Sequence, residues 1–147
     1  MTADPHRPRP LPSRDHVEAL DLAHRLERSD AASASADRRA LLLYWYGAGA
    51  THLRAEEAVL LAAWERHGGR DHPLNASIRA EHARLGEEVA ALAPDAHPPP
   101  DRLRRVGRAL ALHVRRQEHE LTGVVEHAVP AEELATVHES LDELRHS

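Results

Sequence analysis

Four long segments of helix-forming residues, separated by breaks rich in Gly, Pro and small residues, constrain the fold of this chain most strongly. The breaks lie at 29–35, 67–73 and 93–100, and residues of these types interrupt helices. Ala, Leu, Arg and Glu dominate between the breaks, and all four favour helix. No run alternates apolar and polar residues as a half-buried strand does. The sequence therefore predicts helices at about 13–28, 36–66, 74–93 and 100–128, followed by a short fifth helix at about 131–145.

The short connections between these segments favour one architecture. Loops of about seven residues between long helices are typical of an up-down-up-down bundle. We expect an all-α fold in which 13–147 form a four-helix bundle with a short C-terminal fifth helix. The first twelve residues, 1–12, are rich in Pro and Arg and are expected to form a flexible leader.

Histidine and cysteine contents restrict the chemistry that such a bundle can support. The chain has 13 His and 24 Asp and Glu residues but no Cys. The lack of Cys excludes a disulfide scaffold, a thiolate zinc site, a Cys-ligated iron–sulfur cluster and a cysteine nucleophile. Imidazole and carboxylate remain as ligands, and this set suits non-heme iron, manganese or a histidine-rich zinc centre.

Charge and hydropathy exclude several classes of partner. A formal net charge of −5 and a pI near 6.2 argue against nucleic-acid binding through a general electrostatic field. The longest uncharged apolar stretch covers only 40–50, whereas a membrane span needs about 20 residues. The leader lacks the apolar region of a secretory signal, so we expect a cytoplasmic protein. Nucleophile-elbow and phosphate-loop motifs are absent from the sequence.

Histidines interrupt the predicted core-facing stripe of all four long helices. These are His16, His52, His82 and His113. On the second segment the inward stripe is predicted to be Trp45, Ala48, His52, Glu56, Val59 and Ala63. His52 and Glu56 are thus neighbours at i, i+4 on one helix face. A buried imidazole or carboxylate must be paired or bound to a metal, and a single inward His is more often a satisfied core residue. Four of them on four stripes favour a shared metal site.

Four short blocks carry a resemblance to a known family. They are Arg14-Asp15-His16, His52-Leu53-Arg54-Ala55-Glu56-Glu57, Glu81-His82 and His113-Val114-Arg115-Arg116-Gln117-Glu118. In order, spacing and loop positions this pattern resembles the hemerythrin-like (HHE cation-binding) family over about residues 14–130. The resemblance implies a four-helix bundle around a non-heme iron centre, usually di-iron, with a mononuclear centre as the alternative.

The same resemblance assigns roles to residues of this chain. It implies that His16, His52, His82 and His113 are terminal ligands. It implies that Glu56 and Glu118 are the two bridging carboxylates. It also implies binding of, or reaction with, O2, peroxide or NO, or sensing of iron or redox state. No catalytic acid or base is identifiable from the sequence.

Two positions depart from the family's pattern. Oxygen-carrying members have a second His four residues before the one matched by His82, where this chain has Ile78. Many bacterial members have Glu where this chain has Gln117, so the second carboxylate would have to come from Glu118, about 100° further round the helix. These departures favour one alternative, a degenerate bundle with one or no metal that acts as a regulatory or interaction module. A zinc or manganese hydrolase is a further alternative, because three His and a carboxylate also suit zinc.

Overall fold

The computed structural model describes residues 14–145, so the predicted leader at 1–12 lies outside the described residues. The first helix is α1 (Arg14–Glu27). The second long helical segment consists of α2 (Ala34–Tyr44), η1 (Trp45–Gly49), α3 (Ala50–Ala55), η2 (Glu56–Leu61), α4 (Ala62–Trp64) and η3 (Glu65–Gly69), where η marks π-helical turns. The third is α5 (Pro73–Leu92). The fourth consists of α6 (Pro100–Arg116), η4 (Gln117–Leu121) and α7 (Thr122–Ala128), and α8 (Ala131–Arg145) follows.

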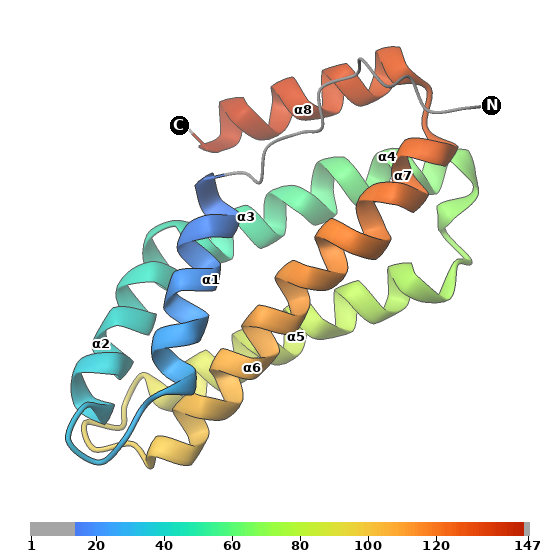
Figure 1. Ribbon diagram of the computed structural model, residues 1–147. Coiled ribbons are helices and arrows are strands. Elements are labelled where there is room, and N and C mark those ends of the chain that lie inside the picture. Colours follow the sequence, from blue (N-terminus) through green and yellow to red (C-terminus); the bar gives the residue numbers. More distant parts are fainter. Residues whose placement is uncertain (1–13, 146–147) are drawn as a thin grey trace.

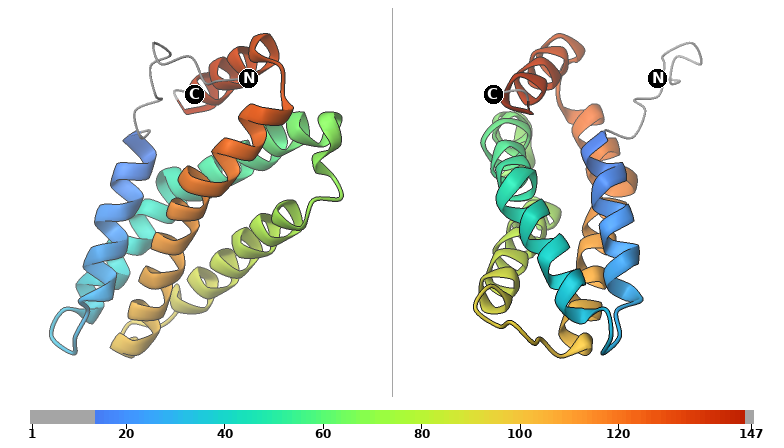
Figure 2. Two further views of the ribbon diagram at one scale, coloured as in Figure 1. Left: turned by 45° about the vertical axis from the view of Figure 1, so that its right-hand side comes forward. Right: turned by 90° about the vertical axis from the view of Figure 1, so that its left-hand side faces the viewer.

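The four long segments run alternately up and down and form one bundle (Figures 1 and 2). The predicted all-α fold with a short C-terminal helix is confirmed, and residues 14–145 contain no strand. Helix α8 folds back over one end of the bundle and packs against α3 and η2. No helix of the described chain combines the length and the apolar character needed to span a bilayer.

The breaks seen in the sequence end the helices through backbone geometry. Gly68 has φ +97°, a conformation that side chains other than Gly rarely adopt, and it closes the second segment. At the start of α5 the His72 side chain accepts a hydrogen bond from the Leu74 backbone N–H, and Pro73 follows the cap. Pro100 is likewise the first residue of α6, which has no capping side-chain hydrogen bond; Pro at a first helical position loses no hydrogen bond.

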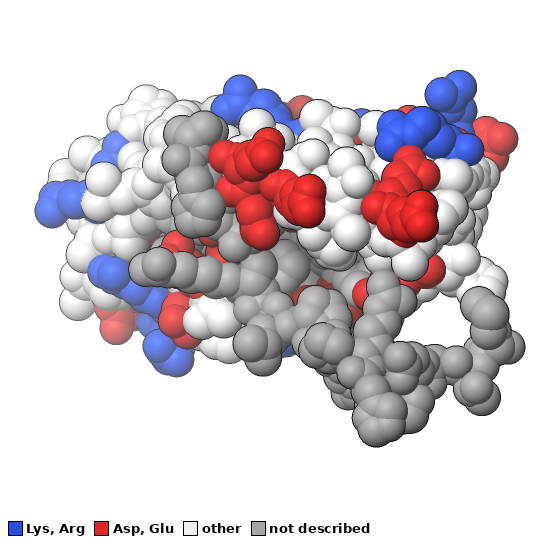
Figure 3. Space-filling view, turned by 90° about the horizontal axis from the view of Figure 1, so that it is seen from above, with Lys and Arg blue, Asp and Glu red and all other residues white. Residues whose placement is uncertain are grey.

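Amphipathic packing fixes α8 on the bundle. Leu134 and Val137 are buried, and Glu133 forms ion pairs with Arg66 and His67 of η3. Viewed from above, clusters of acidic side chains stand out on this end of the molecule (Figure 3). The apolar face of α8 therefore turns toward the second helical segment, and acidic side chains remain at the surface.

The core has two apolar clusters with a polar layer between them. The α1–α6 cluster includes Leu26, Leu53, Leu85, Leu103 and Leu110, and the α4–α7 cluster includes Leu61, Trp64, Ile78, Leu121 and Val125. On two helices the predicted ligands fall between these clusters along the chain: Glu56 lies between Leu53 and Leu61, and His82 between Ile78 and Leu85. His113 lies at the end of the α1–α6 cluster, just before its last member on that helix, Val114.

The π-helical turns correct the predicted stripe of the second segment. Ala48 was expected to face the core, but it is exposed and Gly49 is buried instead. Val59 is only half-buried, whereas Leu61 is fully buried. A π turn bonds i to i+5 and so inserts one residue into the helical repeat. The inward face is therefore displaced locally, from Ala48 to Gly49 in η1 and from Val59 to Leu61 in η2, whereas Glu56 and Ala63 are buried as predicted.

A close approach of α1 and α6 depends on Gly107. A Cβ at this position would meet the Ala23 carbonyl oxygen and Leu26 Cβ, both at 2.8 Å. We therefore expect Gly107→Ala to lower the free energy of unfolding by about 1–3 kcal/mol, although Ala favours helix by about 1 kcal/mol. Gly123→Ala is the matched control, because a Cβ there meets nothing within 4 Å. Denaturant unfolding measures both, and equal effects would contradict this packing.

Candidate metal centre

Four histidines from four helices converge on one buried carboxylate. His16 comes from α1, His52 from α3, His82 from α5 and His113 from α6. Glu56, at the start of η2, is only 1% exposed. His82 and His113 are buried as well, whereas His16 and His52 are partly exposed. The structure thus brings together five of the six residues predicted as metal ligands.

Glu56 is shared by two groups of possible ligands. One group is His16, His52 and Glu56, and the other is Glu56, His82 and His113; within each group the ligand atoms lie within 4.8 Å of one another. Glu56 Oε1 is 2.5 Å from His52 Nε2. Glu56 Oε2 is 3.7 Å from His82 Nε2 and 3.9 Å from His113 Nε2. One oxygen of Glu56 therefore faces His52 and the other faces His82 and His113, which is the arrangement of a carboxylate shared between two ligand groups.

Unsatisfied buried atoms show that these residues fit a cation. Within 14–145, Glu56 Oε2, His82 Nε2 and His113 Nε2 are buried and make no hydrogen bond. Leaving such groups unpaired costs about 1–3 kcal/mol each, and buried polar groups are normally satisfied. A cation between the three atoms would satisfy all of them with nitrogen and oxygen ligands.

Each of the four imidazoles has a second carboxylate on its outer side, at Nδ1. The pairs are His82–Glu57 at 2.8 Å, His113–Glu81 at 3.3 Å, His52–Asp15 at 3.4 Å and His16–Glu118 at 3.4 Å. A carboxylate at Nδ1 accepts a hydrogen bond from the Nδ1–H group, which keeps the proton on that nitrogen and leaves the Nε2 lone pair for a metal. Such outer carboxylates are a regular feature of histidine metal sites.

These outer carboxylates close a ring around the bundle. Asp15 of the first helix meets the histidine of the second, and Glu57 of the second helix meets that of the third. Glu81 of the third helix meets the histidine of the fourth, and Glu118 of the fourth returns to the first. We call this arrangement the carboxylate ring. It links all four helices at the level of the shared carboxylate.

Arginines support two members of the carboxylate ring. Arg79 Nη1 lies 3.6 Å from Glu57 Oε2, and Arg116 pairs with Glu81. These two carboxylates belong to the His82 and His113 half of the centre. The carboxylates of Glu57 and Glu81 are therefore each held by an arginine as well as by an imidazole.

Burial and neighbouring charges set the protonation states of the centre. Burial lowers the pKa of His16 and of His82, which favours neutral imidazoles. Burial alone raises the pKa of Glu56, but the hydrogen bond from His52 holds it below its usual value. A carboxylate among neutral imidazoles is the protonation state that metal binding requires.

Glu118 has a different environment from the one predicted for a second bridge. Its Oε1 lies 3.4 Å from His16 Nδ1, on the outer side of that ring, and it belongs to neither group of possible ligands. Its neighbour Gln117 is buried, one helical turn after His113. The structure therefore places the amide of Gln117 on the inward face of the helix and Glu118, the predicted second carboxylate, in the carboxylate ring.

Sequence reasoning included Asp15, Glu57 and Glu81 in the family-like blocks but gave none of them a role on the outer side of a histidine. A signal for them exists, because each is the immediate sequence neighbour of a predicted ligand. A residue next to an inward position lies about 100° round the helix, and so faces the adjacent helix rather than the bundle axis. Which adjacent helix it meets depends on the order of helices in space.

No family model matches the chain. No curated protein and no solved structure matches it either. The donor geometry therefore carries the assignment of a candidate metal centre.

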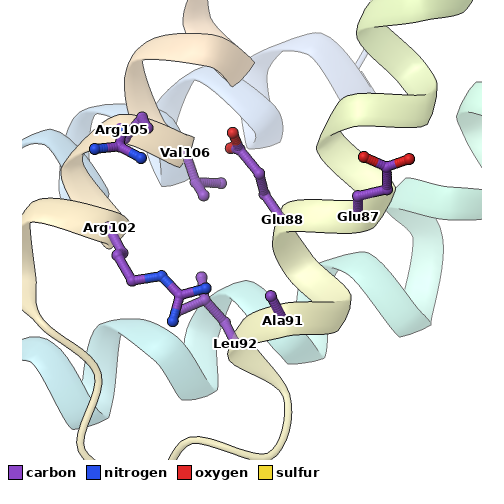
Figure 4. Close-up of a pocket in the computed structure, with 7 residues that line it drawn as sticks. All are labelled: Glu87, Glu88, Ala91, Leu92, Arg102, Arg105 and Val106. Carbon is purple, nitrogen blue, oxygen red and sulfur yellow. The ribbon is translucent and has the colours of Figure 1, made fainter.

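Two surface hollows lie away from the centre. One, of about 170 Å³, lies between α5 and α6, where Glu88 extends toward Arg105 and Val106 (Figure 4). The other is a wide cleft beside η3 and α7, lined by His67, His72, His119 and His127 among others. Within the part of the chain that the structure describes, neither contains three possible ligands as close together as those around Glu56.

The carboxylate ring predicts an effect on metal affinity. Glu57→Gln keeps the side-chain shape but removes the charge that orients His82 Nδ1. We expect it to weaken metal binding by about 10- to 100-fold. Competition with a chromophoric chelator measures the affinity. Glu87→Gln, at an exposed position of α5, is the control and should bind metal like the unchanged chain; equal affinities for all three proteins would contradict the role of the ring.

Proposed function

We propose that this chain is a hemerythrin-like protein that holds a pair of non-heme iron ions around Glu56. In this proposal it binds, or reacts with, O2 or another small molecule such as peroxide or NO. The observation that supports it is the shared position of Glu56 between two imidazole pairs. Each imidazole pair, together with Glu56, would hold one ion, and the metal would supply the capacity to bind a small ligand.

The donor set favours iron over the alternatives. Imidazole nitrogen and carboxylate oxygen together hold iron in both the ferrous and the ferric state. Carboxylates from facing helices, with histidines at bundle-core positions, are typical of di-iron sites in helical bundles. A hydrolytic zinc or manganese site needs room for its substrate, and Glu56, His82 and His113 are buried between two apolar clusters.

The chain itself would supply binding, orientation and exclusion of water. When bound, an iron pair supplies the capacity to exchange electrons with a small oxidant. The imidazoles hold the ions, and the carboxylate ring fixes the direction of each Nε2 lone pair. Leu61, Ile78 and Leu121, all fully buried, close one side of the centre and restrict entry of water.

A second candidate function rests on Ile78. This residue is fully buried in the α4–α7 cluster, one turn before His82, and provides no ligand atom. The centre then has five inner ligand residues, four His and Glu56. A module that holds a single metal ion and acts through protein contacts would need only one of the two groups of possible ligands that share Glu56.

Metal analysis separates these functions. In chain purified from iron-supplemented cultures we expect about two iron atoms per chain. His52→Ala removes one ligand and the short contact to Glu56, so it should remove most of the metal. His138→Ala is the matched control, because His138 is exposed on α8, and it should leave the content unchanged. Elemental analysis also measures zinc and manganese.

Three outcomes of that analysis would count against the proposal. A chain that contains no iron after purification from iron-supplemented cultures would contradict the proposal outright. A content of one ion per chain would favour the single-metal module. Equal losses in His52→Ala and His138→Ala would show that the metal binds elsewhere.

A further inference from the structure

The solvent face of α6 carries a line of positive charge around an apolar side chain. Its members, which we call the arginine stripe, are Arg105, Arg108, Leu112 and Arg115. All four are exposed, Leu112 to 54%, and helical periodicity places them on the face opposite the core. Of the arginines on α6, only Arg104 and Arg116 form ion pairs within the part of the chain that the structure describes. The arginine stripe therefore keeps its charge for another partner.

The solvent face of α8 carries the opposite charge. Its members, which we call the acidic stripe, are Glu132, Glu139 and Glu143. All three are exposed, and none of them forms an ion pair within residues 14–145. Glu133 differs from them, because it pairs with Arg66 and His67 of the bundle. Acidic side chains stand out on this end of the molecule (Figure 3).

The two stripes have matching spacings along their helices. Arg108 and Arg115 are seven residues apart, and so are Glu132 and Glu139; seven residues span about 10.5 Å of helix. The third charges, on Arg105 and Glu143, lie three and four residues further along. Antiparallel helices would therefore form three pairs in one register: Arg115–Glu132, Arg108–Glu139 and Arg105–Glu143. In this register Leu112 lies opposite Ala135, which is exposed and uncharged.

The stripes of one chain lie at different ends of the molecule. Helix α8 crosses one end of the bundle and packs against α3 and η2, whereas α6 packs on α1 and α5 and begins at the other end (Figure 1). Each stripe is therefore open to a different molecule. A second copy of this chain is an occupant whose charge and spacing both fit, and complementary charge favours encounter in the correct orientation.

We propose that the acidic stripe of α8 in one copy docks antiparallel on the arginine stripe of α6 in a second copy. The contact joins two different faces, so it is heterologous. It goes beyond the proposed function and needs no bound metal, because every contributing residue lies on the outer surface. Exposed ion pairs contribute little each, so the dissociation constant should exceed about 1 µM. Salt should weaken the contact by screening.

Sedimentation velocity of the full chain tests this contact. In about 20 mM salt the average mass should rise above that of one chain as the protein concentration increases to about 500 µM, and in about 500 mM salt it should return to that of one chain. Arg108→Glu places like charges opposite Glu139 and should weaken the association by at least about tenfold. Arg39→Glu makes the same charge change at an exposed position of α2, so it should keep the affinity within about threefold.

A charge exchange between the two stripes identifies the partner surfaces. Glu139→Arg should weaken self-association as Arg108→Glu does, whereas Glu87→Arg, at an exposed position of α5, should not. A mixture of the Arg108→Glu and Glu139→Arg chains restores opposite charges across the contact. The mixture should therefore associate at least about tenfold more tightly than either variant alone.

Three results would overturn the inference. A chain that keeps the mass of one copy at low salt over the whole concentration range would do so, and would leave the arginine stripe to a foreign anionic partner. Equal losses in Arg108→Glu and Arg39→Glu would show an effect of net charge alone. A mixture that associates no more tightly than its components would show that the two stripes do not meet. None of these results bears on the metal centre.

Discussion

The orientation of four imidazoles by carboxylates from the preceding helix is the interaction on which the centre depends. Each outer carboxylate engages Nδ1, and the Nε2 atoms of His52, His82 and His113 lie toward Glu56. Because the fourth carboxylate returns to the first helix, the orientation of each ligand depends on the position of its neighbour. The bundle and the site are therefore coupled, and a shift of one helix disturbs a ligand on the next.

The surrounding architecture supports this polar layer in two ways. Apolar clusters on either side provide the hydrophobic burial that stabilises the bundle. The π-helical turns allow Glu56 and Gln117 to begin new helical repeats directly at the site. Single π turns inside helices often occur at functional sites. The polar layer is costly without a cation, because buried donors and acceptors around Glu56 lack hydrogen bonds.

The sequence predicted the helices and the inward histidines better than the details between them. Pro and Gly breaks and helical periodicity placed all five helices, because these signals are local. The stripes also selected the four histidines and Glu56 that the structure brings together. The π turns left no such signal, so Ala48 was wrongly expected to face the core. The carboxylate ring depends on which helices are neighbours in space, and no local pattern of Asp15, Glu57 or Glu81 contains that information.

Anomalous diffraction from crystals of the iron-loaded chain tests the central claim most directly. The account predicts two iron peaks with Glu56 between them, one beside His16 and His52 and the other beside His82 and His113. A single peak, or peaks bound away from Glu56, would contradict it.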